Sequence, residues 1–340
     1  MAKLYGGTAS GRLPTMADVA NKVGVSRQLV SIVFRGGSGV NPETEARIRS
    51  AAKEIGYRPN LAARSLRQDS SMYIGVVFHT SESSMDELLP ALYKHAEEAG
   101  YKIVLSAVSS LRSESEAIDE VLGHRCEGII LISPQLPKSR LQILAREIPM
   151  VSIGRRTAGI RWGMVSSWGE RGVAEAVNHL IALGHSEISC IYAKNMNDGE
   201  YRLEGYLNAM DAAGLKPDVL ELEGDFAELG GARAADLLLA RKRLPTAIIC
   251  NNDQSAFGLT HRLQAEGVRY PEDISVVGYD DTLAKWPFLD FTSVRQEGDE
   301  LAQAAIFDLA ARIRGEKFQS ETVLTSTRLI ARSSTAAPSR

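Results

Sequence analysis

Between residues 15 and 55, apolar residues recur every three or four positions, a spacing that predicts three short helices. Thr15 and Asp18 form a capping-box-like start for the first helix, and Gly24 can supply the tight turn after it. Ser26 can cap the second helix with its hydroxyl. The pattern therefore predicts a helix-turn-helix unit in which three helices share one small core.

From Tyr73 onward the pattern changes to short runs rich in β-branched and aliphatic residues, separated by helical stretches. Alternation of this kind predicts an α/β fold with parallel sheets and flanking helices. One series covers residues 73–154 and a second covers residues 169–280. Two series of similar rhythm predict two lobes with a cleft between them, which is a common place for a ligand.

Polar side chains follow several of these predicted strands, where ligands of open α/β sheets bind. A carboxylate and a guanidinium at a cleft suit the neighbouring hydroxyls of a sugar, because each can bond two groups at once. The alternatives are a salt bridge for the carboxylate, a cap or surface position for the histidine and a turn for the asparagine. The candidates are His79, Ser106, Ser133 and Arg155 in the first series, and Asn252 and Asp280 in the second.

Charge divides the chain in the same way as the hydrophobic pattern. The 340 residues carry a net charge of −3. Residues 1–68 hold 11 basic and four acidic residues, a balance of +7, whereas the remaining 272 residues hold 28 basic and 38 acidic residues, a balance of −10. A basic head on an acidic body indicates that the head meets a polyanion, although chance clustering on a solvated surface is the alternative.

The second predicted helix carries the argument for reading DNA. Its amino-terminal end presents Arg27 and Gln28, while its later apolar residues belong to the core. Arginine matches the two acceptors of guanine, and glutamine matches the donor and acceptor of adenine. Thr15, Ser26 and Ser31 carry short hydroxyls that suit phosphates, with helix capping as the alternative for the first two.

Residues 56–68 form a basic segment after the head. Pro59 disfavours helix just before it, and Asn60 can cap a short helix over residues 61–67 that is too short to be stable alone. Such a helix would form only with a partner, and Leu66 suits a wedge into a minor-groove base step. An unremarkable basic linker is the alternative.

These segments together resemble the lactose-repressor/galactose-repressor (LacI/GalR) family of bacterial transcription regulators. The resemblance begins in TMADVANKVGVSRQLVS (residues 15–31) and continues through GYRPNLAARSLR (56–67). It extends through LIALGHSEI (180–188), NNDQSAFGL (251–259) and DISVVGYDD (273–281), so it covers nearly the whole chain.

The resemblance implies that the head binds one half of an operator and that a hinge helix at 60–67 forms on DNA. Ile32 and Leu29 depart from the family, which commonly has arginine and threonine there, so the operator preference cannot be copied from other members. The residues that the resemblance places at DNA are Thr15, Ser26, Arg27, Gln28, Ser31, Tyr57, Asn60, Arg64 and Leu66.

The family's architecture also implies a two-lobed body like that of periplasmic sugar-binding proteins, with a small-molecule effector in the cleft. Trp168 and Gly169 stand where many relatives carry an acidic or amide pair, and Trp168 either stacks on the effector or packs, the latter slightly favoured. The effector positions implied are His79, Ser133, Arg155, Arg202, Phe226, Asn252, Asp280 and Gln296.

The expected organisation has two tails and three functional parts. The body consists of a first lobe at about 72–162 and 294–324 and a second at about 163–293 and 325–332. The remaining parts are a disordered tail (1–13), the DNA-binding domain (14–59), the hinge and linker (60–71) and a disordered tail (333–340).

Other classes of protein fit the sequence less well. No GxGxxG after a strand, phosphate loop, GxSxG or HExxH motif is present, so neither an enzyme, a cofactor nor a metal site is expected. The three cysteines lie far apart in apolar runs, which favours buried thiols. No segment looks like a signal peptide or a membrane span, which favours a cytoplasmic protein, on the nucleoid when bound to DNA. We expect a dimeric repressor controlled by a sugar-like effector; a solute-binding protein without DNA function is the alternative.

Overall fold

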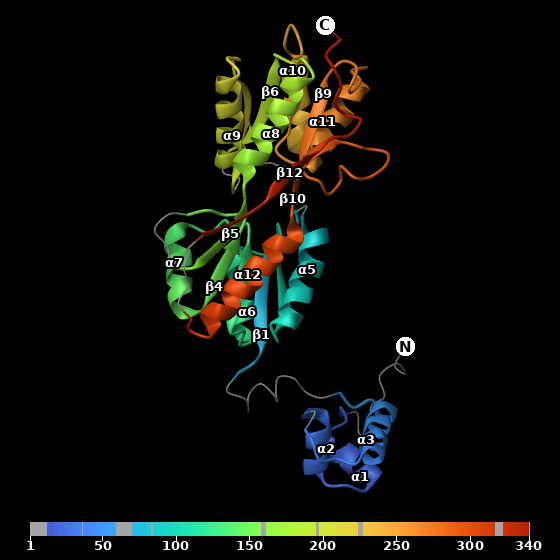
Figure 1. Cartoon of the computed structure of the whole chain (residues 1–340). Coiled ribbons are helices and arrows are strands. Elements are labelled where there is room, and N and C mark those ends of the chain that lie inside the picture. Colours follow the sequence, from blue (N-terminus) through green and yellow to red (C-terminus); the bar gives the residue numbers. More distant parts are fainter. Residues whose placement is uncertain are drawn as a thin grey trace. The chain divides into compact units, whose positions relative to one another are not determined.

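The structure is a computed structural model. It describes residues 12–35, 37–58, 70–82, 84–157, 161–194, 197–223, 227–316 and 322–339. Contacts divide the chain into two compact units, Met1–Ser71 and Met72–Arg340 (Figure 1).

The described part of the first unit consists of α1 (Met16–Val23), α2 (Arg27–Arg35) and α3 (Pro42–Ile55) (Figure 1). Helix α1 contacts both other helices, and the apolar stripes of all three meet in one core. The predicted three-helix unit is therefore confirmed. Its buried core residues are Val19, Ala20, Val30, Val33, Ile48, Ala52 and Tyr57.

Local hydrogen bonds explain where α1 and α2 begin and end. The Asp18 carboxylate accepts from the Thr15 backbone N–H at 2.7 Å and from its hydroxyl at 2.8 Å. Gly24 ends α1 with a φ of 76°, in the left-handed region that glycine adopts without strain. The Ser26 hydroxyl oxygen accepts from the Leu29 N–H at 3.1 Å, which caps α2. These contacts confirm the predicted helix ends.

The first lobe of the second unit is a six-stranded parallel sheet in the order β11-β5-β4-β3-β1-β2. Helices α5 and α12 cover one face, with α12 crossing β3, β4 and β5, and helices α6 and α7 contribute to a second core on the other face (Figure 1). The elements are β1 (Tyr73–His79), α5 (Met85–Glu98), β2 (Lys102–Val108), α6 (Glu114–Gly123), β3 (Gly128–Ile132), α7 (Lys138–Glu147), β4 (Met150–Ile153), β5 (Gly163–Ser167), α12 (Gly298–Ile313) and β11 (Thr322–Thr325).

The second lobe repeats this plan with the strand order β12-β10-β9-β8-β6-β7, in which only β12 runs antiparallel to its neighbour. Helices α8 and α9 pack against each other and contribute residues to one core, and α10 and α11 pack against each other and contribute residues to the other core. The elements are α8 (Gly169–Ala182), β6 (Ile188–Ala193), α9 (Gly199–Ala212), β7 (Asp218–Leu222), α10 (Glu228–Leu239), β8 (Ala247–Ile249), α11 (Asp253–Ala265), β9 (Ser275–Asp280), β10 (Thr292–Gln296) and β12 (Thr327–Ile330).

The lobe boundaries differ from those expected by a few residues. Strand β5 pairs with β4 in the first lobe, although residues 163–167 were expected in the second. Residues 294–296 belong to β10, which pairs with β9 in the second lobe, although the second segment of the first lobe was expected to begin at residue 294. The crossings therefore fall at the ends of these strands. Short strands in crossover segments carry too few apolar residues to mark the sheet to which they belong.

The described part of the carboxyl-terminal tail is ordered, so the expectation of disorder is wrong for it. Ser334 is fully buried, and its hydroxyl donates to the Val276 carbonyl at 2.6 Å. A ring nitrogen of His185 lies 2.8 Å from the Ala336 carbonyl oxygen. Burial lowers the pKa of His185 and so favours its neutral form. The tail consists of small residues, whose pattern alone does not reveal that their polar groups bond the sheet.

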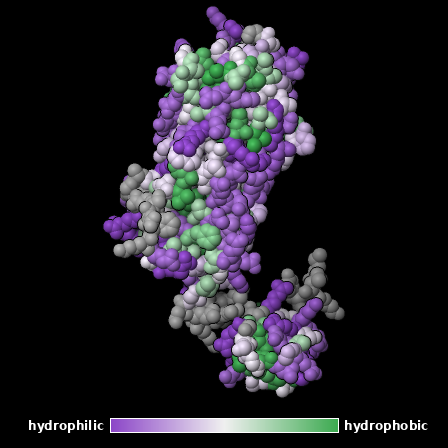
Figure 2. All heavy atoms as spheres, in the orientation of Figure 1, coloured by the Kyte–Doolittle hydropathy of each residue, from purple (hydrophilic) through white to green (hydrophobic). Residues whose placement is uncertain are grey.

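Hydrophilic side chains cover most of the surface of the second unit in the view of Figure 2, with hydrophobic residues in separate groups. Apolar side chains on both faces of each sheet instead fill the four cores of this unit. No described helix combines the length and apolar composition needed to cross a lipid bilayer.

Candidate functional site

Helix α2 presents a polar amino-terminal end to solvent. Arg27 and Gln28 are its first two residues, and both are exposed. Val30 and Val33 on the opposite side are buried in the head's core. The packing therefore leaves two long polar side chains available at the end of the helix that would enter a major groove.

The hydroxyls predicted to contact phosphates lie just before α1 (Thr15), just before α2 (Ser26) and within α2 (Ser31). Thr15 and Ser26 are exposed, and Ser31 is partly buried. The hydrogen bonds above show that Thr15 and Ser26 take part in helix capping. Capping and phosphate contact are compatible, because a hydroxyl has one donor and two acceptor sites. The phosphate contacts stay predictions.

Tyr57 has a structural role that the sequence analysis did not assign. Its side chain is buried in the head's core, and its ring lies edge-on to Phe34 with a centroid distance of 5.4 Å. Burial raises the pKa of the Tyr57 hydroxyl. Its DNA contact stays a prediction. Asn60, Arg64 and Leu66 lie outside the described residues.

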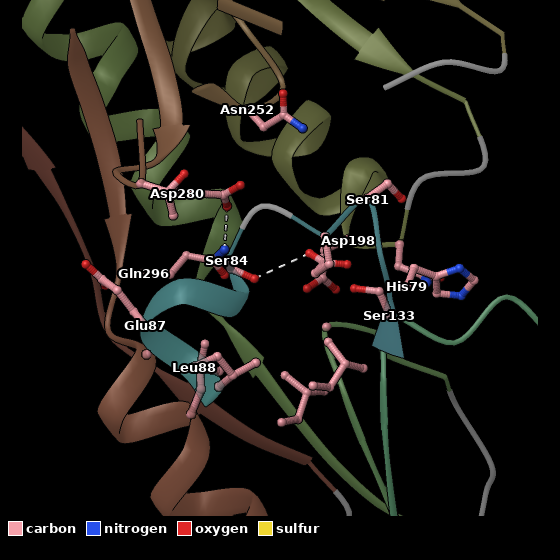
Figure 3. Close-up of a pocket in the computed structure, with 18 of the residues that line it drawn as sticks. His79, Ser81, Ser84, Glu87, Leu88, Ser133, Asp198, Asn252, Asp280 and Gln296 are labelled. Atoms are coloured by element: carbon pink, nitrogen blue, oxygen red, sulfur yellow. Dashed lines mark hydrogen bonds between the residues drawn. The ribbon is translucent and has the colours of Figure 1, made fainter. Parts of the chain in front are cut away.

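A cavity of about 430 Å³ lies between the two lobes of the second unit (Figure 3). The first lobe lines it with the carboxyl ends of β1, β3 and β4 and with the start of α5. The second lobe contributes the start of α9, the residue before α11 and the ends of β9 and β10. Its size suits a small organic molecule, and its position at strand ends is the one predicted.

Most of the expected effector residues meet at this cavity. They come from both series of strands, so the two lobes bring together residues that lie far apart in the sequence. Phe226 lies outside the described residues. Those that line the cavity are His79, Ser133, Arg202, Asn252, Asp280 and Gln296.

Arg155 does not line the described cavity, which corrects the prediction for this residue. Its guanidinium donates to the carbonyl oxygens of Pro134 at 3.0 Å and Leu136 at 2.6 Å. It therefore holds the loop that follows β3. Ser106 is likewise buried elsewhere, donating to Glu120 at 2.7 Å. A position after a strand does not determine the direction in which the side chain points.

Trp168 also lies outside the described lining of the cavity. The Arg171 guanidinium lies 3.9 Å from the centroid of its ring, and the backbone N–H of Trp168 donates to the Thr325 carbonyl at 3.0 Å. These contacts agree with the packing role that was slightly favoured.

A chain of hydrogen bonds orients the Asp280 carboxylate. The Gln296 amide donates to it at 2.6 Å (Figure 3), and the Gln296 oxygen accepts from the Ser167 hydroxyl at 2.7 Å. Ser167 ends β5 in the first lobe, whereas Asp280 ends β9 in the second. Asp280 is thus positioned by groups from both lobes.

Arg202, which lines the same cavity as Asp280, is fixed by two neighbours. Its guanidinium lies 3.6 Å from the centroid of the Tyr279 ring and donates to the Asn251 carbonyl at 2.7 Å. The stacking leaves the edge of the guanidinium as the part that can bond a ligand.

Two carboxylates of the cavity, the partly buried Glu82 and the buried Asp198, were missed by the sequence analysis. Burial raises the pKa of Glu82, and the charge of Asp280 adds to the rise. Burial also raises the pKa of Asp198, against the opposing effects of the Ser166 hydroxyl and of Arg202. Glu82 follows strand β1 by three residues, a weak signal, whereas the loop that positions Asp198 has no local pattern that marks a site.

Three of the cavity residues adopt backbone conformations that are uncommon outside glycine. The φ angles are 48° for Ser133, 59° for Asp198 and 93° for Asp280. Such conformations cost about 1–3 kcal/mol each and cluster at ligand sites, where the surrounding structure imposes them. The concentration of three at one cavity supports a binding role for it.

Contacts between the lobes hold the cavity walls together. The Asn197 side-chain amide donates to the Pro134 carbonyl at 3.0 Å, and Lys285 pairs with Glu87 at 2.5 Å. Because these contacts join opposite lobes, a ligand that changes the shape of the cavity can change the orientation of one lobe relative to the other.

Comparison with known proteins assigns the chain to a family. The profile described as "Bacterial regulatory proteins, lacI family" matches residues 15–60, and the profile "Periplasmic binding protein-like domain" matches residues 177–335. A repressor from Escherichia coli O139:H28, "HTH-type transcriptional repressor PurR", is 31% identical over 333 residues, covering 95% of this chain and 97% of its own. The chain belongs to the LacI family.

Solved structures of LacI-family proteins share the fold. The lac repressor dimer bound to operator and the anti-inducer ONPF has a TM-score of 0.81 at 28% identity and covers 96% of this chain and 100% of its own. A LacI transcriptional regulator from a Rhodococcus species has a TM-score of 0.74 at 33% identity, covering 78% and 98%. The CelR–cellobiose complex has a TM-score of 0.69 at 29% identity, covering 94% and 99%. The predicted family, fold class and regulatory function are confirmed.

The three cysteines and two of the histidines, His179 and His185, have structural surroundings. All three cysteines are buried, and burial raises the pKa of Cys126 to about 11 and of Cys190 to about 12. A thiol with so high a pKa is a poor nucleophile at neutral pH. His179 and His185 contact Thr335 and Ala336 of the carboxyl-terminal tail. The relatives named above are regulators, and these contacts give the cysteines and the two histidines structural roles.

Proposed function

We propose that this LacI-family protein represses transcription as a homodimer whose two heads bind the halves of a pseudo-palindromic operator, and that a small molecule in the cavity controls operator affinity. The observation that carries the proposal is the exposed pair Arg27 and Gln28 at the start of α2 in a basic head. A two-fold symmetric dimer matches a site with two-fold symmetry. The family supports a bacterial, cytoplasmic location, on the nucleoid when bound.

The proposed DNA contacts divide into readers and positioning groups. Arg27 reads guanine and Gln28 reads adenine in the major groove. The remaining groups contact phosphates or the minor groove and fix the orientation of the head. This second set consists of Thr15, Ser26, Ser31, Tyr57, Asn60, Arg64 and Leu66.

The proposed effector is a sugar or sugar derivative. Support comes from the size and polar lining of the cavity, from the Asp280 and Arg202 pair of functional groups and from the cellobiose complex of the relative CelR. Gln296 positions Asp280 and also lines the cavity, so it serves both purposes. The proposed contacts are His79, Ser133, Arg202, Phe226, Asn252, Asp280 and Gln296.

The proposed link between cavity and head is the segment at residues 60–67. Its sequence is too short for a stable isolated helix, so its folding depends on its partners. A ligand that shifts the two lobes changes the spacing of the two hinges in a dimer, and thereby the cost of forming this helix on DNA. Coupling free energies of about 1–3 kcal/mol are typical of such systems.

Fluorescence anisotropy tests this link. An operator is first selected from a random duplex pool, and a compound is chosen from sugars, sugar phosphates and nucleosides by its rise in melting temperature. Adding this compound should change operator affinity by about 5- to 150-fold.

The matched control is Asp280→Asn, which should keep operator affinity without the compound and lose most of the response to it. Identical operator affinities with and without a compound that binds the wild-type protein would contradict the proposed link.

A further inference from the structure

An arginine of the first lobe is buried among groups of the second lobe. Arg156 lies in the loop between β4 and β5, which both belong to the first sheet. Gly154 begins this loop with a φ of 78°, and its N–H donates to the Val165 carbonyl at 2.9 Å. The side chain of Arg156 is only 9% exposed, so its charge needs partners within the protein.

The partners of Arg156 come mainly from helices α8 and α9. Two of its guanidinium nitrogens donate to the carboxylate of Glu170 on α8, at 3.0 and 2.9 Å. The guanidinium carbon lies 4.1 Å from the centroid of the Tyr201 ring on α9. A further hydrogen bond goes to the carbonyl oxygen of Ser167, the last residue of β5. A two-point contact with a carboxylate fixes the relative position of both groups.

A second contact beside Arg156 joins the same parts of the two lobes. The Ser166 hydroxyl of β5 donates to the Oδ2 atom of Asp198, the residue before α9. This contact is possible in either protonation state of Asp198, because a protonated carboxyl group keeps an acceptor oxygen. We call Arg156, Ser166, Glu170, Asp198 and Tyr201 the interlobe cluster.

The interlobe cluster is directly connected to the cavity. Asn197, Asp198 and Arg202 line the cavity, and they lie just before α9 or in its first turn, which also carries Tyr201. Arg156 therefore packs against the turn of helix that presents three side chains to the cavity. A ligand that bonds these side chains acts on the same turn.

The ion pair between Lys285 and Glu87 also joins the lobes, but it is more exposed. Its side chains are 39% and 37% exposed, and pairs in water contribute little. Arg156 and Glu170 are 9% and 25% exposed. Removing one member of a buried pair leaves the other without a counter-charge, and separation of the lobes would return that group to water. Loss of the Arg156 pair should therefore favour separated lobes more strongly.

We propose that Arg156 is a positioning residue that holds the two lobes together without effector, by binding Glu170 and packing on Tyr201. It also fixes the first turn of α9, which carries residues of the cavity. This goes beyond the proposed control by an effector, because it names the contact that sets the separation of the lobes before any small molecule binds.

The distance between two spin labels, measured by double electron–electron resonance, tests the proposal. The labels are attached at Arg140→Cys on α7 of the first lobe and at Glu204→Cys on α9 of the second, both exposed positions. The three native cysteines are buried, so the labels attach to the introduced ones. The sample is the full chain without DNA or effector, diluted with a large excess of unlabelled chain so that distances within one chain are measured.

Arg156→Met should lengthen the most probable distance by more than about 2 Å, the scale of domain rearrangements, because Glu170 is then hydrated only when the lobes separate. Glu170→Gln should also lengthen it, since the guanidinium loses its carboxylate. Combining Arg156→Met with Glu170→Met should return the distance toward the wild-type value, because two apolar side chains pack without a counter-charge. General damage to the structure would instead make the double variant at least as different as either single variant.

Arg155→Met is the matched control, because it removes the neighbouring arginine of the same loop. The Arg155 guanidinium donates to the carbonyl oxygens of Pro134 and Leu136, both in the first lobe. The distance should stay at the wild-type value. Melting curves establish that each variant is folded, and either single variant of the ion pair is sufficient if the other does not fold.

Three results would each overturn the proposal: the folded single variants keep the wild-type distance, Arg155→Met lengthens it as much as Arg156→Met, or the double variant stays as long as the single ones. Neither DNA nor effector is in the sample, so a failure of operator binding or of effector control leaves the outcome unchanged. Lobes that stay together without Arg156 would in turn leave the proposed repressor function intact.

Discussion

Arg27→Ala should lower affinity for the selected operator by about 10- to 100-fold, because a bidentate contact between arginine and guanine contributes about 1–3 kcal/mol of discrimination. Affinity for a random duplex of the same length should fall by no more than about threefold, since that binding depends on charge alone. The side chain is exposed at the start of α2, and the core of the head is formed by other residues, so the head should stay folded. Fluorescence anisotropy at one salt concentration measures both affinities.

Lys53→Ala is the matched control for this prediction. It removes the same charge from the same head, at an exposed position near the end of α3. It should lower both affinities by a similar small factor, because a general electrostatic contribution does not depend on base sequence. If Arg27→Ala weakened operator and random DNA equally, Arg27 would be a charge contact and not a base reader.

Gly258→Ala should destabilise the second unit by about 3 kcal/mol, at the upper end of the usual cost of overpacking. A Cβ atom at this position of α11 would lie 1.9 Å from the Glu228 carbonyl oxygen of α10. The reverse contact is equally close, since a Cβ at Gly231 of α10 would lie 1.9 Å from the Ser255 carbonyl oxygen. The clash is with backbone on both sides, so no side-chain rotation relieves it. The midpoint of urea unfolding measures the loss.

Gly123→Ala provides the comparison, because it is the same substitution at the end of another helix, α6. A Cβ there meets no atom within 4 Å, and the residue is exposed. Alanine should leave the midpoint unchanged or raise it slightly, since glycine costs about 0.5–1 kcal/mol relative to alanine inside helices. Equal midpoints for Gly258→Ala and the wild-type protein would show that α10 and α11 can separate without cost, against the close packing described above.

Amphipathic segments were the part of the fold that the sequence predicted best. The three helices of the head and the alternating elements of both lobes have one clear apolar face or a short apolar run. Helix α12 is central to the first lobe but was not predicted from the sequence. Its buried residues, which include Ala302, Ala305 and Leu309, lie on several sides of the helix. A helix apolar on several sides has weak periodicity. Strand β5, only five residues long, was missed for the related reason that it carries few apolar residues.

The site was predictable where it depends on strand ends and less so where it depends on loops. Asp280 ends a strand and Asn252 follows one, both strands have apolar runs that are easy to recognise, and both residues line the cavity. Arg155 follows a strand as well, but its side chain turns to the Pro134 carbonyl. Glu82 and Asp198 reach the cavity through loop geometry, which no spacing of residue types reveals.

The ratio of affinities for the selected operator and for a random duplex of equal length, measured at physiological salt, tests the central claim that the head reads DNA through α2. Specific binding of regulators typically exceeds non-specific binding by about 10³- to 10⁷-fold, and we expect a ratio of at least about 10³. A ratio near one, or no duplex enriched by selection, would contradict the account.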